Sequence, residues 1–368
     1  MNNEEIIQKN YLEWTQFPFD KETIQEVQKL KNNNHLKFQD SFYKDLSFGT
    51  GGMRGIVGYG PNRVNKYTFG KNTQGISNYI NKISDDKEAV VIAYDCRNQS
   101  EELANQVAEI FSSNNIKVYL FSSIRPTPEL SYALIKLKCI CGIVLTASHN
   151  PPEYNGYKVY WKDGGQIVPP IDKKLIKEIE SINFEDINFV KNDSNIQLID
   201  TEIDSSFTKD SIKNGKIGES KREEYRVVFT PIHGTSYKLL PAVLIGAGFK
   251  DFYIVEEQAI PDGNFSTVKS PNPEEPEALE IAIKKAEILN ADIVIGTDPD
   301  ADRVGLAVKN HQGDYIILNG NQMMILLTEY ILSKKENLDQ SFFIGSTVVS
   351  TNMIKHIANN YNVDFLSL

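Results

Sequence analysis

Short apolar runs alternate with amphipathic segments along most of this sequence, and this alternation limits the folds open to the chain. Each apolar run is brief and uninterrupted, as expected for a strand that is buried on both faces of a parallel sheet. We therefore expect an α/β fold of successive mixed, mostly parallel βαβ sheets flanked by helices. The first series comprises predicted strands over 89–94, 117–121 and 141–145, with predicted helices over 100–111 and 128–137.

The same alternation recurs twice further along the chain. A second series begins near residue 225 and a third near residue 322. The second has predicted strands over 225–229, 252–255 and 291–296, and predicted helices over 237–244 and 275–289. The third has predicted helices over 322–332 and 352–359, and predicted strands over 342–345 and 363–366.

The length of the chain and its composition suggest how these series divide into domains. At 368 residues the chain can form two or three separate cores. The segment 171–221 is charged, rich in asparagine and serine, and only weakly periodic, so we expect it to cross between domains. The expected domains are 1–205, an α/β domain with an N-terminal helical arm; 206–318, a second α/β domain; and 319–368, the incomplete start of a third α/β domain.

Net charge and cysteine content argue against several kinds of partner. The net charge of -10, from 39 basic and 49 acidic residues, disfavours nucleic acid and anionic membrane surfaces. The cysteines Cys96, Cys139 and Cys141 cannot all pair, and they lack the partners of a zinc site. Residues 1–10 do not resemble a secretory signal, and no apolar run approaches membrane-spanning length. We therefore expect a protein of the reducing cytoplasm.

A serine and a histidine directly follow the predicted strand 141–145. The motif Thr-Ala-Ser-His-Asn-Pro places Ser148 and His149 at the carboxyl end of that strand, where open α/β sheets bind ligands. A serine hydroxyl needs a base, a metal or a prior covalent modification to react at neutral pH. His149 and Lys158 are the nearest groups that could assist it. Taken alone, the motif is more typical of an ordinary polar loop than of a catalytic site.

A glycine-dense stretch over 48–55 presents a single arginine, Arg54. It is a poor nucleotide-binding loop because no Gly-Lys-Ser/Thr closes it and Arg54 stands where a dinucleotide fingerprint has its third glycine. We expect a loop whose backbone can approach a phosphate group that Arg54 binds. An ordinary tight connection is the alternative.

Three aspartates at alternate positions follow the predicted strand that ends at residue 296. Asp298, Asp300 and Asp302 can converge on one cation, and they would repel one another without it. An EF-hand is excluded because Arg303 and Lys309 stand where that loop needs glycine and glutamate. Phosphatases of the haloacid-dehalogenase type usually carry threonine or valine at the position of Asp302. We therefore favour a cation site over an exposed acidic turn. Mg²⁺ is favoured over Ca²⁺, because few protein ligands are supplied and a phosphate oxygen can complete the coordination shell.

Four motifs together resemble those of the α-D-phosphohexomutase family, the phosphoglucomutases and phosphomannomutases. They occur in the order typical of the family and span nearly the whole chain, so coincidence is a poor explanation. The motifs are GTGGMRG at 49–55, TASHNP at 146–151 with NGYK at 155–158, PDGNF at 261–265 with PNPE at 271–274, and DPDADR at 298–303.

The resemblance implies a role for each matching residue. Ser148 would be the phosphoserine that passes its phosphoryl group to a sugar phosphate, giving a bisphosphorylated intermediate that returns its other phosphate. Mg²⁺ would be held by three aspartates and by an oxygen of the Ser148 phosphate. The other implied roles are metal ligands for Asp298, Asp300 and Asp302, general acid and base for Lys158, orientation of phosphate oxygens for Arg54, His149 and Arg303, and a structural role for His233.

The implied activity is that of an isomerase that interconverts 1-phospho and 6-phospho sugars, with a bisphosphorylated sugar as activator. Phosphopentomutase-type and sugar-phosphate phosphatase activities are the alternatives. The sequence selects neither glucose, mannose nor pentose phosphate, and it does not give the oligomeric state. Members of the family have four domains, and the sugar-reading and distal phosphate-binding loops have no counterpart before Leu368. We therefore expect a fragment with weak or absent turnover.

Overall fold

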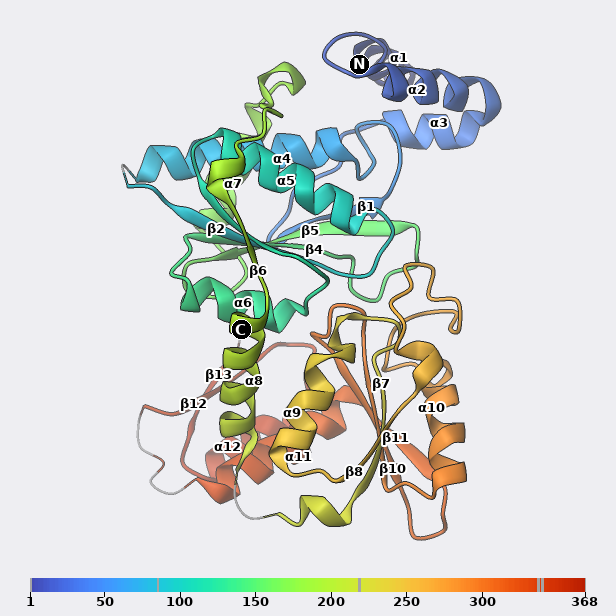
Figure 1. Ribbon diagram of the computed structural model, residues 1–368, viewed down its shortest axis with the longest axis vertical. Helices are drawn as coiled ribbons and strands as arrows, with labels where there is room; N and C mark the ends of the chain where they lie inside the picture. The colour runs from blue at the N-terminus through green and yellow to red at the C-terminus, as the bar shows by residue number, and fades with distance from the viewer. Residues whose placement is uncertain (1, 85, 218–219, 336–337, 339–340, 368) are drawn as a thin grey trace.

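The first sheet of the computed structural model has six strands in the order β1-β5-β4-β2-β3-β6 (Figure 1). The structure describes residues 2–84, 86–217, 220–335, 338 and 341–367. The three strands predicted in the first series have the expected bounds. Parallel pairing joins β4 (Cys141–Leu145), β2 (Ala89–Tyr94), β3 (Lys117–Phe121) and β6 (Ile196–Ile199), and antiparallel pairing adds β5 (Tyr154–Trp161) and β1 (Gly52–Ile56).

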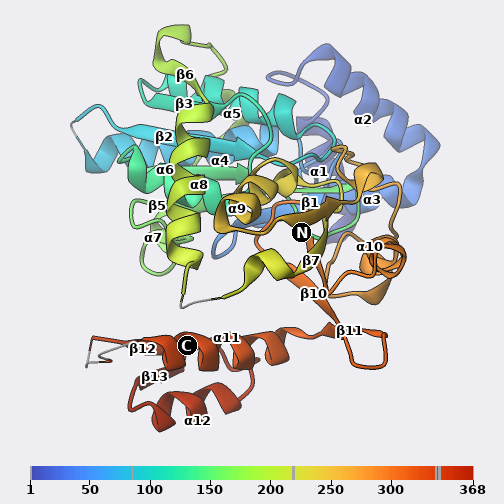
Figure 2. The same cartoon turned by 60° about the horizontal axis from the view of Figure 1, so that its bottom comes forward.

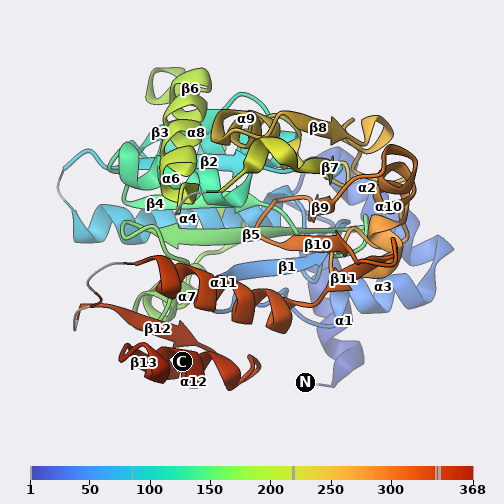
Figure 3. The same cartoon turned by 90° about the horizontal axis from the view of Figure 1, so that it is seen from below.

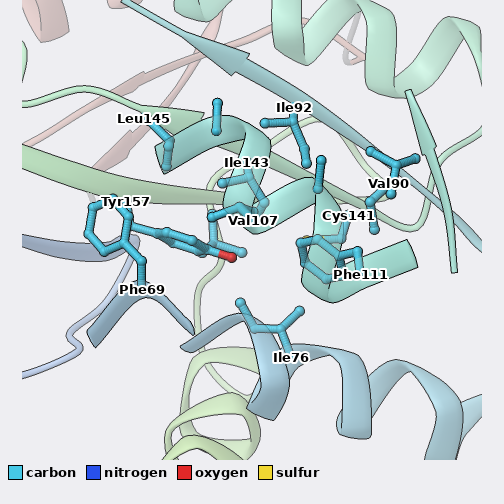
Figure 4. Packing of buried hydrophobic residues seen from close by; sticks show 14 of the residues in the cluster. Phe69, Ile76, Val90, Ile92, Val107, Phe111, Cys141, Ile143, Leu145 and Tyr157 are labelled. Carbon is cyan, nitrogen blue, oxygen red and sulfur yellow. The ribbon is translucent and has the colours of Figure 1, made fainter. Parts of the chain in front are cut away.

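Strand β2 is buried on both faces, which explains its unbroken apolar sequence. Val90 and Ile92 belong to the cluster shown in Figure 4, whereas Val91 and Ala93 belong to a second cluster on the opposite face. None of the four side chains is exposed. Burial of this kind is expected when helices cover both faces of a parallel sheet. The covering helices are α4 (Lys66–Ile83), α5 (Ser100–Ser113) and α7 (Ile171–Glu180) on one face and α6 (Thr127–Lys136) on the other.

We call the first sheet with its covering helices the first lobe. The second lobe is built on a five-stranded sheet in the order β11-β10-β9-β7-β8. Its three parallel strands are those predicted for the second series, with bounds that differ by one or two residues. Two antiparallel strands, which the sequence pattern did not indicate, follow the aspartate motif. The elements are β7 (Arg226–Thr230), β8 (Asp251–Ile254), β9 (Ile293–Thr297), β10 (Val304–Lys309) and β11 (Tyr315–Leu318), with helices α9 (Leu239–Ala247) and α10 (Pro276–Leu289).

The last part of the chain forms a small unit at one side of the molecule (Figures 2 and 3). Here α11 (Gly320–Lys334) packs on α12 (Met353–Asn360), and β12 (Phe343–Ser346) pairs in parallel with β13 (Asp364–Ser367). All four elements predicted for the third series are therefore present. Residues 336, 337, 339, 340 and 368 of the expected third domain lie outside the described residues.

The expected N-terminal helical arm comprises α1 (Asn3–Glu13), α2 (Lys21–Asn33) and α3 (His35–Phe42). It docks through an aromatic cluster in which Trp14 is fully buried and stacks on Phe19. Among the described residues, none of the helices has both the length and the apolarity that a membrane span requires.

The expected crossover segment, 171–221, is mostly regular structure. It contains α7, the edge strand β6 and α8 (Thr201–Gly215), although residues 218 and 219 lie outside the described residues. Two of its acidic residues interrupt the apolar periodicity because they bind the buried guanidinium of Arg125: Asp200 lies 3.0 Å from it and Asp204 lies 2.8 Å from it. Helix α8 thereby packs against both α6 and α9, and so links the two lobes.

The structure corrects the prediction for the glycine-dense stretch 48–55 and adds a helix that was not predicted. The glycine-dense stretch 48–55 is only partly a loop, because β1 begins at Gly52 and pairs with β5. Helix α4 was not predicted because Gly70 and Gly75 interrupt its apolar pattern. A Cβ at Gly75 would lie 2.7 Å from the Cα of Ile179, so this glycine lets α7 pack closely.

Glu129 generates a prediction about the pH dependence of stability. Its side chain has no exposed surface, neither carboxylate oxygen has a hydrogen-bond partner among the described residues, and the Nε of Arg125 is 3.7 Å away. Burial, followed by the charge of Asp204, raises the pKa of Glu129 to about 9. The folded protein therefore holds a proton that the unfolded chain releases near pH 4.5, so stability falls as pH rises between these values.

We expect Glu129→Gln, which stays neutral at every pH, to remove this pH-dependent loss of stability. Relative to the wild type, the variant should gain stability from pH 5 to pH 9, by up to about 1.4 kcal/mol per pH unit. Urea unfolding at several pH values measures the difference, and Glu101→Gln, at an exposed position, is the control. Parallel pH profiles for Glu129→Gln and the wild type would contradict the assignment.

Candidate functional site

Ser148 lies in a tight turn immediately after β4. Its φ of 51° is in the left-handed region, which is uncommon for a residue other than glycine. The backbone N–H of Ser148 donates to the hydroxyl oxygen of Thr146 at 2.8 Å, which helps to fix the turn. Only 2% of Ser148 is exposed. Its hydroxyl donates to the Oδ2 of Asp298 at 2.6 Å, and the Nδ1 of His149 lies 3.2 Å away.

Asp298, Asp300 and Asp302 follow β9 in the second lobe and converge on one point. One carboxylate oxygen from each lies within 4.8 Å of the others. Asp298 and Asp300 have no exposed surface, and Asp302 is exposed. Burial and repulsion by the other two carboxylates raise the pKa of Asp298 well above its ordinary value. The Oδ1 of Asp300 has no hydrogen-bond partner in the part of the chain that the structure describes. This crowded, partly unsatisfied set of oxygens fits a hard divalent cation such as Mg²⁺.

Lys158 of β5 reaches the same carboxylates from the first lobe. Its Nζ donates to Asp300 at 2.6 Å and to Asp302 at 2.7 Å. Burial opposes the charge on Lys158, but the two carboxylates outweigh burial and raise the pKa of the ammonium well above its ordinary value. Burial likewise opposes the charge on Asp300, yet Lys158 lowers the pKa of that carboxyl. The lysine is therefore charged in this arrangement.

Three more predicted residues surround the Ser148 turn. Arg54 of β1 is exposed and donates to the side-chain oxygen of Asn150 at 2.6 Å. The backbone N–H of Arg303 donates to the Oδ1 of Asp298 at 3.0 Å. Burial and the nearby charges of Arg303 and Arg54 lower the pKa of His149, which favours its neutral form. Two arginines thus lie beside the turn, close to the three carboxylates.

Gly52 lets β1, which carries Arg54, pair closely with β5, which carries Lys158. Residue 52 pairs with Lys158 and residue 54 with Gly156, so Arg54 and Lys158 lie on adjacent strands. A Cβ at Gly52 would lie 1.9 Å from the carbonyl oxygen of Tyr157, and its φ is 134°. Only glycine permits this close approach.

Thr127 and Arg97 complete the site, and the sequence analysis did not identify them. The Thr127 hydroxyl donates to the Oδ2 of Asp300 at 2.6 Å, and its backbone N–H donates to the Asp300 carbonyl at 2.8 Å. The sequence could have indicated both residues, because each comes shortly after a predicted parallel strand and the carboxyl ends of such strands meet at one edge of the sheet. His233 is not part of this cluster: its Nδ1 lies 2.8 Å from the Ile260 carbonyl and its Nε2 lies 2.8 Å from Thr267.

Comparisons with known proteins identify the family of this chain. The family model for phosphoglucomutase/phosphomannomutase α/β/α domain I matches residues 45–186, and the model for domain II matches residues 205–313. The phosphoglucomutase of Staphylococcus epidermidis is 38% identical over 337 residues, and that of Staphylococcus aureus is 37% identical over 339 residues. In both cases the match covers 91% of this chain and 61% of the relative.

Solved structures show the same fold. A phosphoglucomutase/phosphomannomutase family protein from Burkholderia thailandensis superimposes with a TM-score of 0.69 at 22% identity, covering 86% of this chain and 65% of that one. The phosphoglucomutase pp63/parafusin from Paramecium, in its open form, gives a TM-score of 0.65 at 15% identity, covering 87% of this chain and 61% of that one. With two consecutive family domains matched and relatives aligned over most of its length, the chain belongs to the phosphoglucomutase/phosphomannomutase family, the α-D-phosphohexomutases.

Proposed function

We propose that this chain provides the phosphoserine and metal-binding part of a phosphohexomutase site, which interconverts 1-phospho and 6-phospho sugars through a bisphosphorylated sugar. The observation that carries the proposal is the 2.6 Å hydrogen bond between the Ser148 hydroxyl and Asp298, at the centre of three converging carboxylates. A reactive serine beside a cation site has the two parts that phosphoryl storage requires. The chain spans 61% of the length of its curated relatives.

In this proposal the phosphoryl group moves between Ser148 and a sugar hydroxyl. When a hexose bisphosphate donates, a bond forms between phosphorus and the Ser148 Oγ, and the bond to the sugar oxygen breaks. The serine loses its proton and the sugar oxygen gains one. Transfer from the phosphoserine to the free hydroxyl of a sugar monophosphate reverses these changes and gives the bisphosphorylated sugar, which then returns its other phosphoryl group to Ser148. Storage on serine means that no nucleotide is needed.

Lys158 is the proposed proton donor to the departing sugar oxygen. Since Asp300 and Asp302 raise its pKa, its ammonium is charged and holds a proton for this purpose. In the return transfer Lys158 would accept the proton of the sugar hydroxyl, which requires a lower pKa. Loss of its contacts with these two carboxylates would have that effect, because little would then offset the burial of the ammonium.

Phosphoryl transfer depends mainly on positioning and on positive charge around the phosphoryl oxygens. Mg²⁺ held by Asp298, Asp300 and Asp302 would supply such charge. Arg54, on β1, would form bidentate hydrogen bonds with the phosphate. His149 and Arg303 flank the same turn and would orient the remaining oxygens.

Two further assignments accompany the proposal. A bisphosphorylated sugar would be the activator, because it can phosphorylate an unmodified Ser148. The three cysteines, Cys96, Cys139 and Cys141, are free thiols, which supports a reducing, cytoplasmic location.

The first prediction concerns phosphate on Ser148. Incubation with glucose 1,6-bisphosphate and Mg²⁺ should phosphorylate Ser148 alone, as mapped by mass spectrometry of phosphopeptides. Asp298→Asn should abolish the label, since it removes charge from the cation site and weakens the contact with the serine. Ser148→Ala is the control for label at other sites. Equal labelling of Asp298→Asn and the wild type would show that the carboxylate cluster has no part in the transfer.

The second prediction concerns competition between Lys158 and the metal. Because the ammonium occupies oxygens of Asp300 and Asp302, Lys158→Met should bind Mg²⁺ more tightly, by about tenfold or more, when measured by isothermal titration calorimetry. The same variant should phosphorylate Ser148 more slowly, since it lacks the proton donor. Lys162→Met, at an exposed lysine nearby, is the matched control and should change neither property. Unchanged or weaker Mg²⁺ binding by Lys158→Met would refute the competition.

A further inference from the structure

Arg97 lies beneath the Ser148 turn and binds four of its carbonyl oxygens. One terminal nitrogen of the guanidinium donates to Ser148 at 2.6 Å and to Asn150 at 2.5 Å. The other donates to Pro151 at 2.8 Å and to Tyr154 at 2.9 Å. The side chain has no exposed surface. A single planar group thus fixes the direction of four peptide units around the reactive serine.

These bonds matter because the Ser148 turn is strained. A positive φ at a residue with a Cβ costs on the order of 1 kcal/mol or more, so neighbouring contacts must maintain it. Arg97 binds the carbonyl of Ser148 itself, which helps to set the orientation of its peptide unit. With the Ser148 peptide unit in this orientation, the Ser148 hydroxyl points toward Asp298. Asp95 offsets the buried charge of Arg97 at 3.3 Å and is itself held by the hydroxyl of Ser100 at 2.9 Å.

The second lobe contacts the same guanidinium. The ring centre of Phe265 lies 5.0 Å from the central carbon of Arg97, within the range of a cation–π interaction. The loop that carries Phe265 packs tightly here: a Cβ at Gly263 would lie 2.6 Å from the backbone nitrogen of Asn98. The side chain of Asn98 also donates to that of Asn264 at 2.9 Å. This is the PDGNF motif, to which the phosphoryl-transfer proposal gives no role.

We propose that Arg97 is a positioning residue for phosphoryl transfer at Ser148, and that Phe265 ties this positioning to the docking of the second lobe. Arg97 shapes the turn that presents the Ser148 hydroxyl, while Phe265 belongs to the lobe that carries Asp298. One side chain therefore aligns the phosphoryl acceptor with the carboxylate cluster. The inference rests on the proposed function, because its readout is phosphate on Ser148.

The test compares Arg97→Lys and Phe265→Leu with the wild type in rapid-quench phosphorylation by glucose 1,6-bisphosphate at saturating Mg²⁺. Lysine keeps the charge but has no planar fork to bind four carbonyls. Leucine keeps apolar volume but has no aromatic face. Arg97→Lys should lower the rate constant at least tenfold, and Phe265→Leu should lower it by a smaller factor. The affinity for Mg²⁺, set by the three aspartates, should change by less than about twofold.

A purely structural role would give a different result. Loss of folded protein lowers the amplitude of phosphorylation but leaves the rate constant of the folded fraction unchanged. Arg63→Lys is the matched control, because Arg63 is also buried and donates to backbone carbonyls, those of Asn62 and Asp40. This control should affect amplitude at most.

The possible outcomes separate the two proposals. Absence of label on Ser148 in the wild type would refute the proposed function. Labelling of Arg97→Lys with the wild-type rate constant would refute the positioning role and leave the proposed function intact. If Arg97→Lys does not fold, Phe265→Leu decides: a reduced rate constant supports the inference, and a wild-type rate constant overturns it.

Discussion

Repulsion among three carboxylates is the constraint on which the arrangement of this site depends. Asp298, Asp300 and Asp302 converge within 4.8 Å, and two of them are fully buried. Such a cluster is stable only when cations or hydrogen-bond donors offset its charge. Without metal, the Lys158 ammonium and the hydroxyls of Ser148 and Thr127 provide this compensation. All three come from the opposite lobe, so the same interactions stabilise the site and hold the two lobes together.

The topology explains why these groups meet. Ser148 follows β4, and Thr127 lies a short loop beyond β3, so both lie at the carboxyl edge of the first sheet. The aspartates follow β9 in the second sheet, and this end of the second lobe faces that edge (Figure 1). Antiparallel β5 then brings Lys158 to the same place. The interface between lobes is consequently polar at its centre.

Much of this could be predicted from the sequence, and the failures have physical reasons. Strands buried on both faces gave an unambiguous apolar signal, and the acidic turn indicated a cation site. Helix α4 was missed because its glycines serve close packing, and α8 because its acidic residues bind the buried Arg125. Arg97 and Thr127 were missed because their partners are distant in sequence: backbone carbonyls for the first and Asp300 for the second. Contacts of this kind appear only once the sheet brings separate segments together.

The most direct test of the account follows the phosphoryl group after it reaches Ser148. Protein carrying ³²P on Ser148 would be freed of excess donor and mixed with unlabelled glucose 1-phosphate or glucose 6-phosphate in the presence of Mg²⁺. The account predicts that the label leaves the protein and appears in a hexose bisphosphate. Release of the label only as inorganic phosphate would show that water is the acceptor, as in a phosphatase, and would contradict the account.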